Sequence, residues 1–301
     1  MTIFVGIGFG PIQAGLFLYE AAQSGAFERL IASEIVPSVV EAVNAVHGYV
    51  VNIAHKDAIE QADVTPVQLF NPTLLGECDA LADAIAEATA IATALPSVSA
   101  YSGTTAGAPD RLIAEGLARK HARGGPPVIL YAGENHNHAA ELLREAVAVY
   151  LPDDAREAIL GRAAFVNTVI GKMSGYANPI TSKHALAYIA PGLQRAFLVE
   201  AFSDILVSQF HFADPDAAHE FVPGITRFAQ KRDLFPFEEA KLYCHNAMHA
   251  FAAYLGKIAG CASMAEVRHV PGVLSLVRAA TVEEPGAALV RKYAGVDYLF
   301  T

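Results

Sequence analysis

The chain has 301 residues, of which 53% are hydrophobic, and a formal net charge of −10. Such a chain can bury a large core in two domains, and its acidic balance argues against a nucleic-acid partner because the phosphates would be repelled. No apolar run approaches the ~20 residues needed to cross a bilayer. Three unpatterned cysteines, and a start typical of a strand and not of a signal peptide, favour a reducing cytoplasm.

The first predicted strand, residues 3–7, leads into a glycine-rich turn and then a helix over about 16–24. This order is the context in which a glycine fingerprint binds a dinucleotide, although an ordinary tight turn is the competing interpretation. Gly8 permits the turn, and Gly10 lets the backbone approach a pyrophosphate at the helix N-terminus. Gln13 replaces the third glycine, so the helix–strand contact must be arranged differently. We expect cofactor contacts from six consecutive residues: Gly8, Phe9, Gly10, Pro11, Ile12 and Gln13.

A second strand is predicted over 29–35, and it carries Glu34 about twenty residues past the glycines. A carboxylate at this position accepts hydrogen bonds from the adenosine ribose hydroxyls and repels a 2′-phosphate. Glu34 therefore favours NAD over NADP. The alternatives are that Glu34 is a solvated loop acid and that Ser33 helps to admit the phosphate.

Three helices and three strands are predicted over the next ninety or so residues. The expected helices are 36–46, 79–87 and 110–121, and the expected strands are 48–54, 68–70 and 88–94. The last of these strands is built from small residues, which would leave room for the nicotinamide half of a cofactor.

A further buried strand, 128–132, precedes the polar segment 133–138, Gly-Glu-Asn-His-Asn-His. From the residues alone, Asn135 could be the N-cap of a helix predicted over 139–150. His136 and His138 would diverge at the start of that helix, so we expect no metal there.

A polar, proline-containing stretch at 176–190 is typical of a domain junction. A short helix is predicted before it, at 152–160. Beyond it the chain is expected to be almost wholly helical, at 192–210, 216–220, 221–231, 241–256, 264–268, 270–282 and 286–293.

The helix over 241–256 gathers polar side chains on an apolar background, with Gly256 as its expected C-cap. At ~100° per residue, Lys241, His245 and His249 share one stripe, and Asn246 lies beside it. In a buried helix this grouping is costly unless the groups face a ligand. The alternative is that the Lys241 ammonium reaches solvent, while Asn246 and the two histidines satisfy hydrogen bonds in the core. No acid–histidine motif completes a zinc site, so no metal is expected.

The pattern Lys-x4-Asn-x2-His followed by Ala-Tyr-Leu-Gly resembles the signature of the polyol-specific long-chain dehydrogenases and reductases, the mannitol dehydrogenase family. Further blocks resemble the same family, namely Glu-Asn at 134–135, Phe-Val-Asn at 165–167 and Phe-Leu-Val-Glu at 197–200. Gly171-Lys172 departs from the family pattern, which has Asp-Arg there. Lys172 keeps the positive charge but loses the arginine fork. The resemblance places Lys172 and Asn167 at the substrate.

The resemblance implies that Lys241 is the general base for oxidation of an alcohol, in place of a zinc or a tyrosine. Burial or a neighbouring cation must then lower its pKa. Asn135 and Asn246 would donate to the substrate oxygen as it gains charge. His249 would hold an adjacent hydroxyl.

The expected fold is α/β, with a Rossmann-like NAD-binding domain and a mostly parallel mixed sheet over 1–180 and an all-α catalytic domain over 181–301. The expected function is NAD(H)-dependent, metal-free interconversion of a polyol, or a polyol phosphate of the mannitol 1-phosphate type, with its ketose. The short C-terminal part is most similar to the mannitol-1-phosphate 5-dehydrogenase branch. A sugar-acid reductase (fructuronate or tagaturonate), with Lys172 meeting a carboxylate, and a non-catalytic NAD-binding regulator are the alternatives. The oligomeric state stays open.

Overall fold

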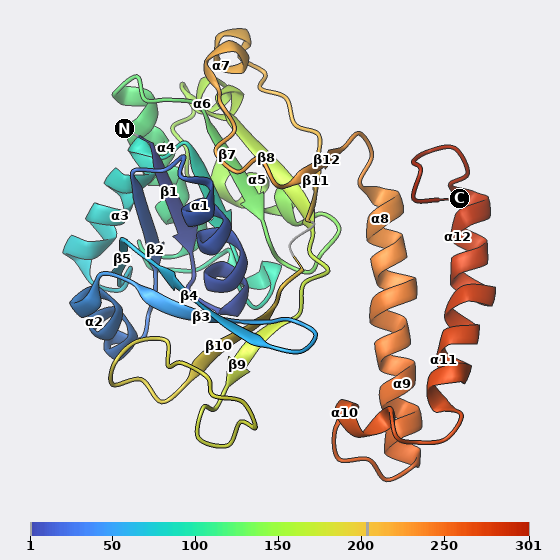
Figure 1. Cartoon of the computed structure of the whole chain (residues 1–301). Coiled ribbons are helices and arrows are strands. Elements are labelled where there is room, and N and C mark those ends of the chain that lie inside the picture. The colour runs from blue at the N-terminus through green and yellow to red at the C-terminus, as the bar shows by residue number, and fades with distance from the viewer. Residues whose placement is uncertain (1, 203–204, 301) are drawn as a thin grey trace. The chain divides into compact units, whose positions relative to one another are not determined.

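The computed structural model describes residues 2–202 and 205–300, which form two compact units (Figure 1). The first unit extends to Arg232 and the second begins at Asp233. The boundary therefore lies well beyond the expected position at 180/181. The reason is that residues after 180 supply three strands to the sheets of the first unit.

In the described part of the first unit, eight strands form one sheet in the order β12-β11-β8-β7-β6-β1-β2-β5. Their bounds are β1 Ile3–Ile7, β2 Arg29–Ser33, β5 Val67–Phe70, β6 Ala90–Thr93, β7 Val128–Ala132, β8 Ala163–Val169, β11 Leu206–Ser208 and β12 Ala229–Lys231. The strands from β8 to β5 are paired in parallel, and β11 runs antiparallel to β8. The expected mostly parallel, mixed sheet is confirmed.

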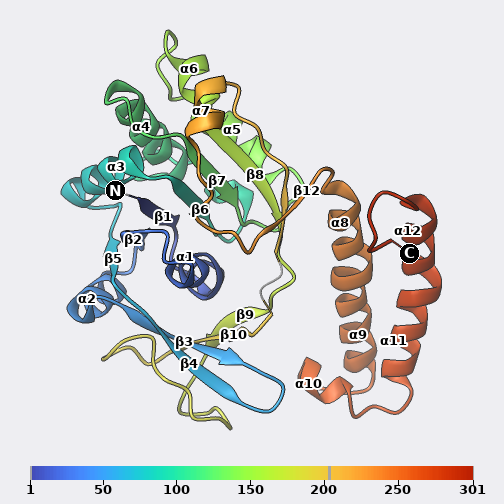
Figure 2. The same cartoon turned by 45° about the horizontal axis from the view of Figure 1, so that its top comes forward.

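Helices cover both faces of this sheet, so its central strands are apolar on both sides. The helices of the first unit are η1 Gln13–Leu18, α1 Tyr19–Ser24, α2 Pro37–Val46, α3 Leu75–Glu87, η2 Val98–Ala100, α4 Pro109–Ala122, α5 Ala139–Ala148, α6 Arg156–Gly161 and α7 Pro215–Glu220. Phe4 of β1 joins the core beneath η1, whereas Val5 joins the core that contains Leu81 of α3 and Leu112 of α4. Figure 2 shows α1 and α3 on opposite sides of β1.

A second sheet of four strands, in the order β4-β3-β10-β9, packs against η1 within the described residues. Its strands are β3 Tyr49–Ala54, β4 Ile59–Val64, β9 Ser174–Ala177 and β10 Ala196–Glu200. Gly15 of η1 lies so close to β10 that a Cβ there would come 2.3 Å from Cγ1 of Val199. This close approach explains why the turn sequence carries a further glycine.

The helices expected at 192–210 and 221–231 are wrong. The described part of the first stretch, which leaves out 203 and 204, contains β10 and β11, and the second stretch ends in β12. In β10 the buried residues Phe197 and Val199 alternate with more exposed ones, which is the period of a strand. The apolar run at β10 is so short that it fits the period of a helix as well as that of a strand.

The described residues of the second unit form helices joined by turns, with no strand. Its helices are α8 Phe235–Ala240, η3 Lys241–Asn246, α9 Ala247–Ile258, α10 Met264–Val267, α11 Val273–Thr281, η4 Val282–Gly286 and α12 Ala287–Lys292. The Glu239 carboxylate joins the first helix to the last, because it accepts hydrogen bonds from Nζ of Lys292 (2.8 Å) and the hydroxyl of Tyr293 (2.6 Å). No helix in the described part of either unit is long and apolar enough to cross a membrane.

Gly256 is not the expected C-cap, because α9 continues to Ile258. A Cβ at Gly256 would lie 2.5 Å from Cγ2 of Val267, so this glycine permits close packing against α10. The turn that follows the helix uses Gly260, whose φ is +81°.

Candidate nucleotide-binding crevice and catalytic helix

A cavity of about 600 Å³ lies at the carboxyl ends of β1, β2 and β6. Its walls include the glycine turn 8–12, residues 33–35, residues 94–96, Gly133 after β7, and Tyr176 of β9. From β1 the chain continues to β2, which pairs with one side of β1, whereas β6 pairs with the other side of β1. In open α/β sheets, ligands bind at such a reversal of strand order.

The glycine turn is shaped by its first glycine. Gly8 has a φ of +90°, and a Cβ there would lie 3.2 Å from the carbonyl oxygen of Ala94. Its N–H donates to Oγ of Ser33 at 2.9 Å, and Ser33 is buried. Ser33 is thus engaged in holding the turn against β2, which counts against a role in admitting a phosphate. A Cβ at Gly10 would meet nothing within 4 Å, so the turn is open at that residue.

Gln13 does not line the crevice, unlike the five residues before it. Its side chain is fully buried, and its amide atoms have no hydrogen-bond partner among the described residues. It lies over Gly6 of β1, where a Cβ would come 2.4 Å from Nε2 of Gln13. The burial of this side chain does not support the expected cofactor contact by Gln13. The close approach of helix and strand is achieved with a glycine on the strand in place of one on the helix.

Glu34 lines the crevice just after β2. Its Oε1 accepts a hydrogen bond from the backbone N–H of Val36 at 2.8 Å, which fixes the carboxylate near the rim. The residue is partly exposed. A carboxylate held in this way can accept further hydrogen bonds from the hydroxyls of a ribose.

The sequence interpretation missed Glu134, a buried carboxylate behind the crevice wall. Glu134 accepts hydrogen bonds from Oγ1 of Thr93 and the N–H of Leu95, both at 2.8 Å, and from the hydroxyl of Tyr101. Burial, with a further contribution from the Glu134 charge, raises the pKa of Tyr101 well above its ordinary value. These bonds tie the end of β6 to η2. The sequence signal for Glu134 is the Glu-Asn pair after β7, from which only the asparagine was predicted to have a role.

Asn135 is exposed and follows β7, two residues after Gly133. The alternative that it caps the next helix is wrong, because α5 begins after His138 and has no side-chain cap bond from that residue. Nδ1 of His136 accepts a hydrogen bond from the backbone N–H of His138 at 3.1 Å. Asn135 therefore keeps its place as a candidate ligand at the carboxyl end of β7.

Asn167 of β8 supports the start of α5. Its Oδ1 accepts from the N–H of Ala140 at 2.8 Å, and its Nδ2 donates to Oε2 of Glu141 at 2.8 Å. The side chain is buried. These contacts give Asn167 a structural role, and they do not support the expected contact with substrate.

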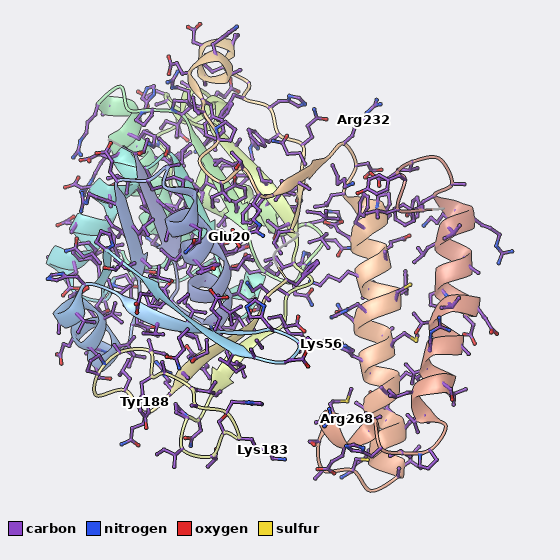
Figure 3. The ribbon with its side chains drawn as sticks, viewed as in Figure 1. Glu20, Lys56, Lys183, Tyr188, Arg232 and Arg268 are labelled. Atoms are coloured by element: carbon purple, nitrogen blue, oxygen red, sulfur yellow. The ribbon has the colours of Figure 1, made fainter. Side chains whose placement is uncertain are left out.

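Lys172 is also buried within the first unit, with an exposed fraction of 5%. Its ammonium lies 5.7 Å from the ring centroid of Tyr19. Burial lowers the pKa of Lys172, while the neighbouring Glu20 carboxylate opposes that shift. Figure 3 labels Glu20, whose carboxylate lies 3.8 Å from the Arg227 guanidinium. A substrate anion would have to compete with Glu20 for Lys172.

In the second unit, Lys241 and Asn246 are the first and last residues of the π-helical turn η3. In an α-helix, residues five apart lie about 140° apart around the axis. The wider π turn reduces this separation, so Asn246 moves toward the side of Lys241, and such turns are frequent at functional sites. Burial lowers the pKa of Lys241, and Glu238 opposes the shift. The rings of His245 and His249 pack with centroids 4.3 Å apart.

The residues that the structure describes contain no group of three or more histidine, cysteine, aspartate or glutamate side chains placed to hold a metal ion. Cys78, Cys244 and Cys261 are free thiols.

Comparison with known proteins identifies the family. Residues 2–220 match the family described as the mannitol dehydrogenase Rossmann domain. The chain belongs to the mannitol dehydrogenase family. Among curated relatives, the mannitol-1-phosphate 5-dehydrogenase of Bacillus licheniformis is 32% identical over 181 residues, which are 60% of this chain and 43% of that protein.

Two solved structures of this kind share the fold. The mannitol 2-dehydrogenase of Pseudomonas fluorescens, in a ternary complex with NAD and D-mannitol, has a TM-score of 0.69 at 14% identity over 93% of this chain. A substrate-free D-sorbitol dehydrogenase has a TM-score of 0.71 at 13% identity, also over 93% of this chain. This chain spans 63% of the mannitol 2-dehydrogenase and 65% of the D-sorbitol dehydrogenase.

Proposed function

We propose that this protein is an NAD(H)-dependent oxidoreductase that interconverts a polyol, or a polyol phosphate of the mannitol 1-phosphate type, with its ketose. The observation that carries the proposal is the crevice at the carboxyl ends of β1, β2 and β6, with a glycine turn on one side and Glu34 on the other. Family membership and the named activities of the relatives support it.

The residues of the crevice fit a dinucleotide. The turn is open at Gly10, where a pyrophosphate needs close access to the backbone. Glu34 is placed to accept hydrogen bonds from the adenosine ribose and to repel a 2′-phosphate, which favours NAD over NADP. When bound, the cofactor supplies the hydride chemistry of the reaction. Ala94, with only a methyl side chain, and Gly133, with none, line the crevice and leave room for its ring.

Three of the four catalytic groups in this proposal, Lys241, Asn246 and His249, lie on η3 and α9. Lys241 takes the hydroxyl proton as the alcohol is oxidised and returns it when the ketose is reduced. Its partial burial lowers its pKa and so favours the neutral amine, as a base requires. Asn246 and Asn135 donate hydrogen bonds to the substrate oxygen, and His249 holds an adjacent hydroxyl. No metal has a role in this scheme.

Further parts of the proposal follow from the chain as a whole. The partner is a small-molecule polyol or ketose, because the net charge of −10 is unsuited to nucleic acid. The free thiols suit a reducing compartment, and we place the protein in the cytoplasm. The first unit is the NAD-binding part, and the second carries the base.

The test is NADH oxidation with four candidate substrates: fructose 6-phosphate, fructose, fructuronate and tagaturonate. Turnover of fructose 6-phosphate or fructose, with little of the two uronates, is the expected result. Preference for a uronate would replace the proposal with a sugar-acid reductase. Tight NADH binding without turnover of any of the four would contradict the enzyme assignment and favour a regulator.

A further inference from the structure

Two adjoining cavities lie at the amino ends of β7 and β8, whereas the glycine turn follows the carboxyl end of β1. One, of about 340 Å³, is formed by the end of α4, the turn at Gly124 and the start of β7. The other, of about 800 Å³, is formed by α5, α6 and the residues before α7. His121 and Arg162 line both cavities. We call the two together the basic hollow.

The lining of the basic hollow carries more cationic than anionic side chains. These are Lys120, Arg144, Arg156 and Arg162 against Glu157 and Asp214, and Arg156 is paired with Asp153 outside the lining. The smaller cavity is lined by Lys120, His121 and Arg162 and has no acidic lining residue. Arg162 is neutralised from outside that cavity, by Asp214 at 3.0 Å and Glu220 at 2.5 Å.

Lys120 is a buried amine in the smaller cavity. It is 4% exposed, and its Nζ donates to the carbonyl oxygen of Ala88 at 2.6 Å. The stem lies over Gly125, where a Cβ would come 2.9 Å from Cγ of Lys120. Burial and the nearby Arg162 lower the pKa of Lys120 to about 7, and Glu87 only partly opposes them. A buried ammonium is normally paired with an anion, but here the charged side chain beside it in the cavity is another cation.

We propose that the basic hollow binds a small oxyanion, a phosphate or a carboxylate, that pairs with the ammonium of Lys120. An ammonium has three donors, and the carbonyl of Ala88 accepts one of them. A charge-assisted bond from an oxyanion would use another. The site is separate from the crevice that we assign to the cofactor, and it does not depend on that assignment.

The proposal makes binding dependent on pH in a defined direction. Three charged or titratable groups face Lys120 from the surrounding elements: His121 on α4, Arg162 after α6 and Glu87 at the end of α3. Above pH 7 the amine of the free protein is mostly neutral. A bound oxyanion favours the ammonium, so binding must take up a proton. The affinity should then fall about tenfold for each pH unit above neutrality.

The experiment is calorimetric titration of the whole chain with sulfate, which has no titration of its own near neutrality. Runs at pH 8 in two buffers of different ionisation enthalpy give the number of protons taken up, and chloride at equal ionic strength is the control. Inorganic phosphate and succinate are the comparison ligands and distinguish the two oxyanion classes. We expect uptake of close to one proton per sulfate, and affinity at least tenfold weaker at pH 9 than at pH 7.

Three variants assign the proton. Lys120→Met keeps the buried stem and should weaken sulfate binding at pH 7 at least tenfold and abolish the uptake. Lys56→Met, on the exposed loop between β3 and β4, is the matched control and should change nothing (Figure 3). His121→Asn should keep the uptake, because the proton belongs to Lys120.

Sulfate affinity that is equal at pH 7 and pH 9, or uptake that survives in Lys120→Met, would overturn the proposal. So would the absence of saturable binding by all three oxyanions. If Lys120→Met has a lowered melting temperature, the proton uptake of the wild-type chain still decides, since it needs no variant.

Discussion

At the scale of single residues, two carboxylates near the crevice are held in different ways. Glu134 accepts three hydrogen bonds from buried donors of the wall. Glu34 accepts one backbone hydrogen bond at the rim and is partly exposed. The first carboxylate is therefore engaged by the protein itself, whereas the second is placed to meet a ligand.

The charge of Glu34 should determine which nucleotide binds. In Glu34→Gln, the affinity for NADH should fall about tenfold, because a hydrogen bond to a charged group is lost. The affinity for NADPH should rise, because the repulsion of its 2′-phosphate is removed. Fluorescence titration with both nucleotides measures the change, and Glu41→Gln, on the exposed side of α2, is the control. An unchanged preference would exclude Glu34 from the ribose site.

Asn246 and His245 should contribute very differently to turnover, although they are neighbours. The π turn moves Asn246 toward Lys241, whereas the His245 ring packs on that of His249. Asn246→Ala should lower kcat about 10²–10³-fold through loss of a donor to the substrate oxygen. His245→Ala should lower kcat less than about tenfold, because we assign His245 no hydrogen bond to the substrate oxygen. Equal losses in steady-state assays would contradict these roles.

At the scale of elements, the helix after β1 begins with a glutamine where the dinucleotide fingerprint has its third glycine. Gln13 occupies the position of the third fingerprint glycine, and Gly6 on β1 provides the space instead. The helix there is π-helical over Gln13–Leu18. Helix and strand therefore fit through a large residue on one element and a small residue on the other.

A double-mutant cycle tests this pairing. Gly6→Ala should destabilise the protein by about 1–3 kcal/mol, because the new methyl group overlaps the Gln13 side chain. Gln13→Ala removes the obstacle, so the same Gly6→Ala change should cost clearly less in that background. Urea unfolding of the four proteins measures the coupling. Equal costs in both backgrounds would show that Gln13 does not set the space above Gly6.

Much of the first unit could be predicted from the sequence, because its buried strands are bounded by clear turn signals. The glycine turn and Glu34 were found for that reason, and they line one cavity. The predictions failed where short apolar runs fit either period, as in β10, and where a residue's partner comes from a distant segment. Asn167 reads as a ligand in the sequence, but its amide is engaged by α5. The π turn at Lys241 has no sequence period that would reveal it.

At the scale of the whole molecule, the domain boundary depends on strand pairing and not on composition. The polar stretch expected to separate the domains lies between β9 and β10, which pair in antiparallel register from Ala196↔Ala177 to Val199↔Ser174. It is therefore a connection within the first unit. The boundary lies at Arg232, which Figure 3 labels.

Cleavage inside that stretch tests the boundary. A specific protease site inserted after the exposed Lys183 should be cut readily. The two fragments should then elute together on native gel filtration, because β9 and β10 remain paired across the cut. Cleavage in denaturant, where the fragments must separate, is the control. Separation under native conditions would restore the boundary near residue 180.

The central claim is that Lys241 acts as the acid in ketose reduction and as the base in alcohol oxidation. The most direct test is the pH profile of NADH oxidation with the best ketose, for Lys241→Ala beside the wild type and Lys257→Ala, a second lysine on the same helix. In the wild type, the rate should fall as pH rises through a pKa below the ordinary value of 10.5, because the acid is the protonated amine. Lys241→Ala should be at least about 10²-fold slower, without that limb and with unchanged NADH affinity. A variant that keeps the wild-type rate and profile would contradict the account.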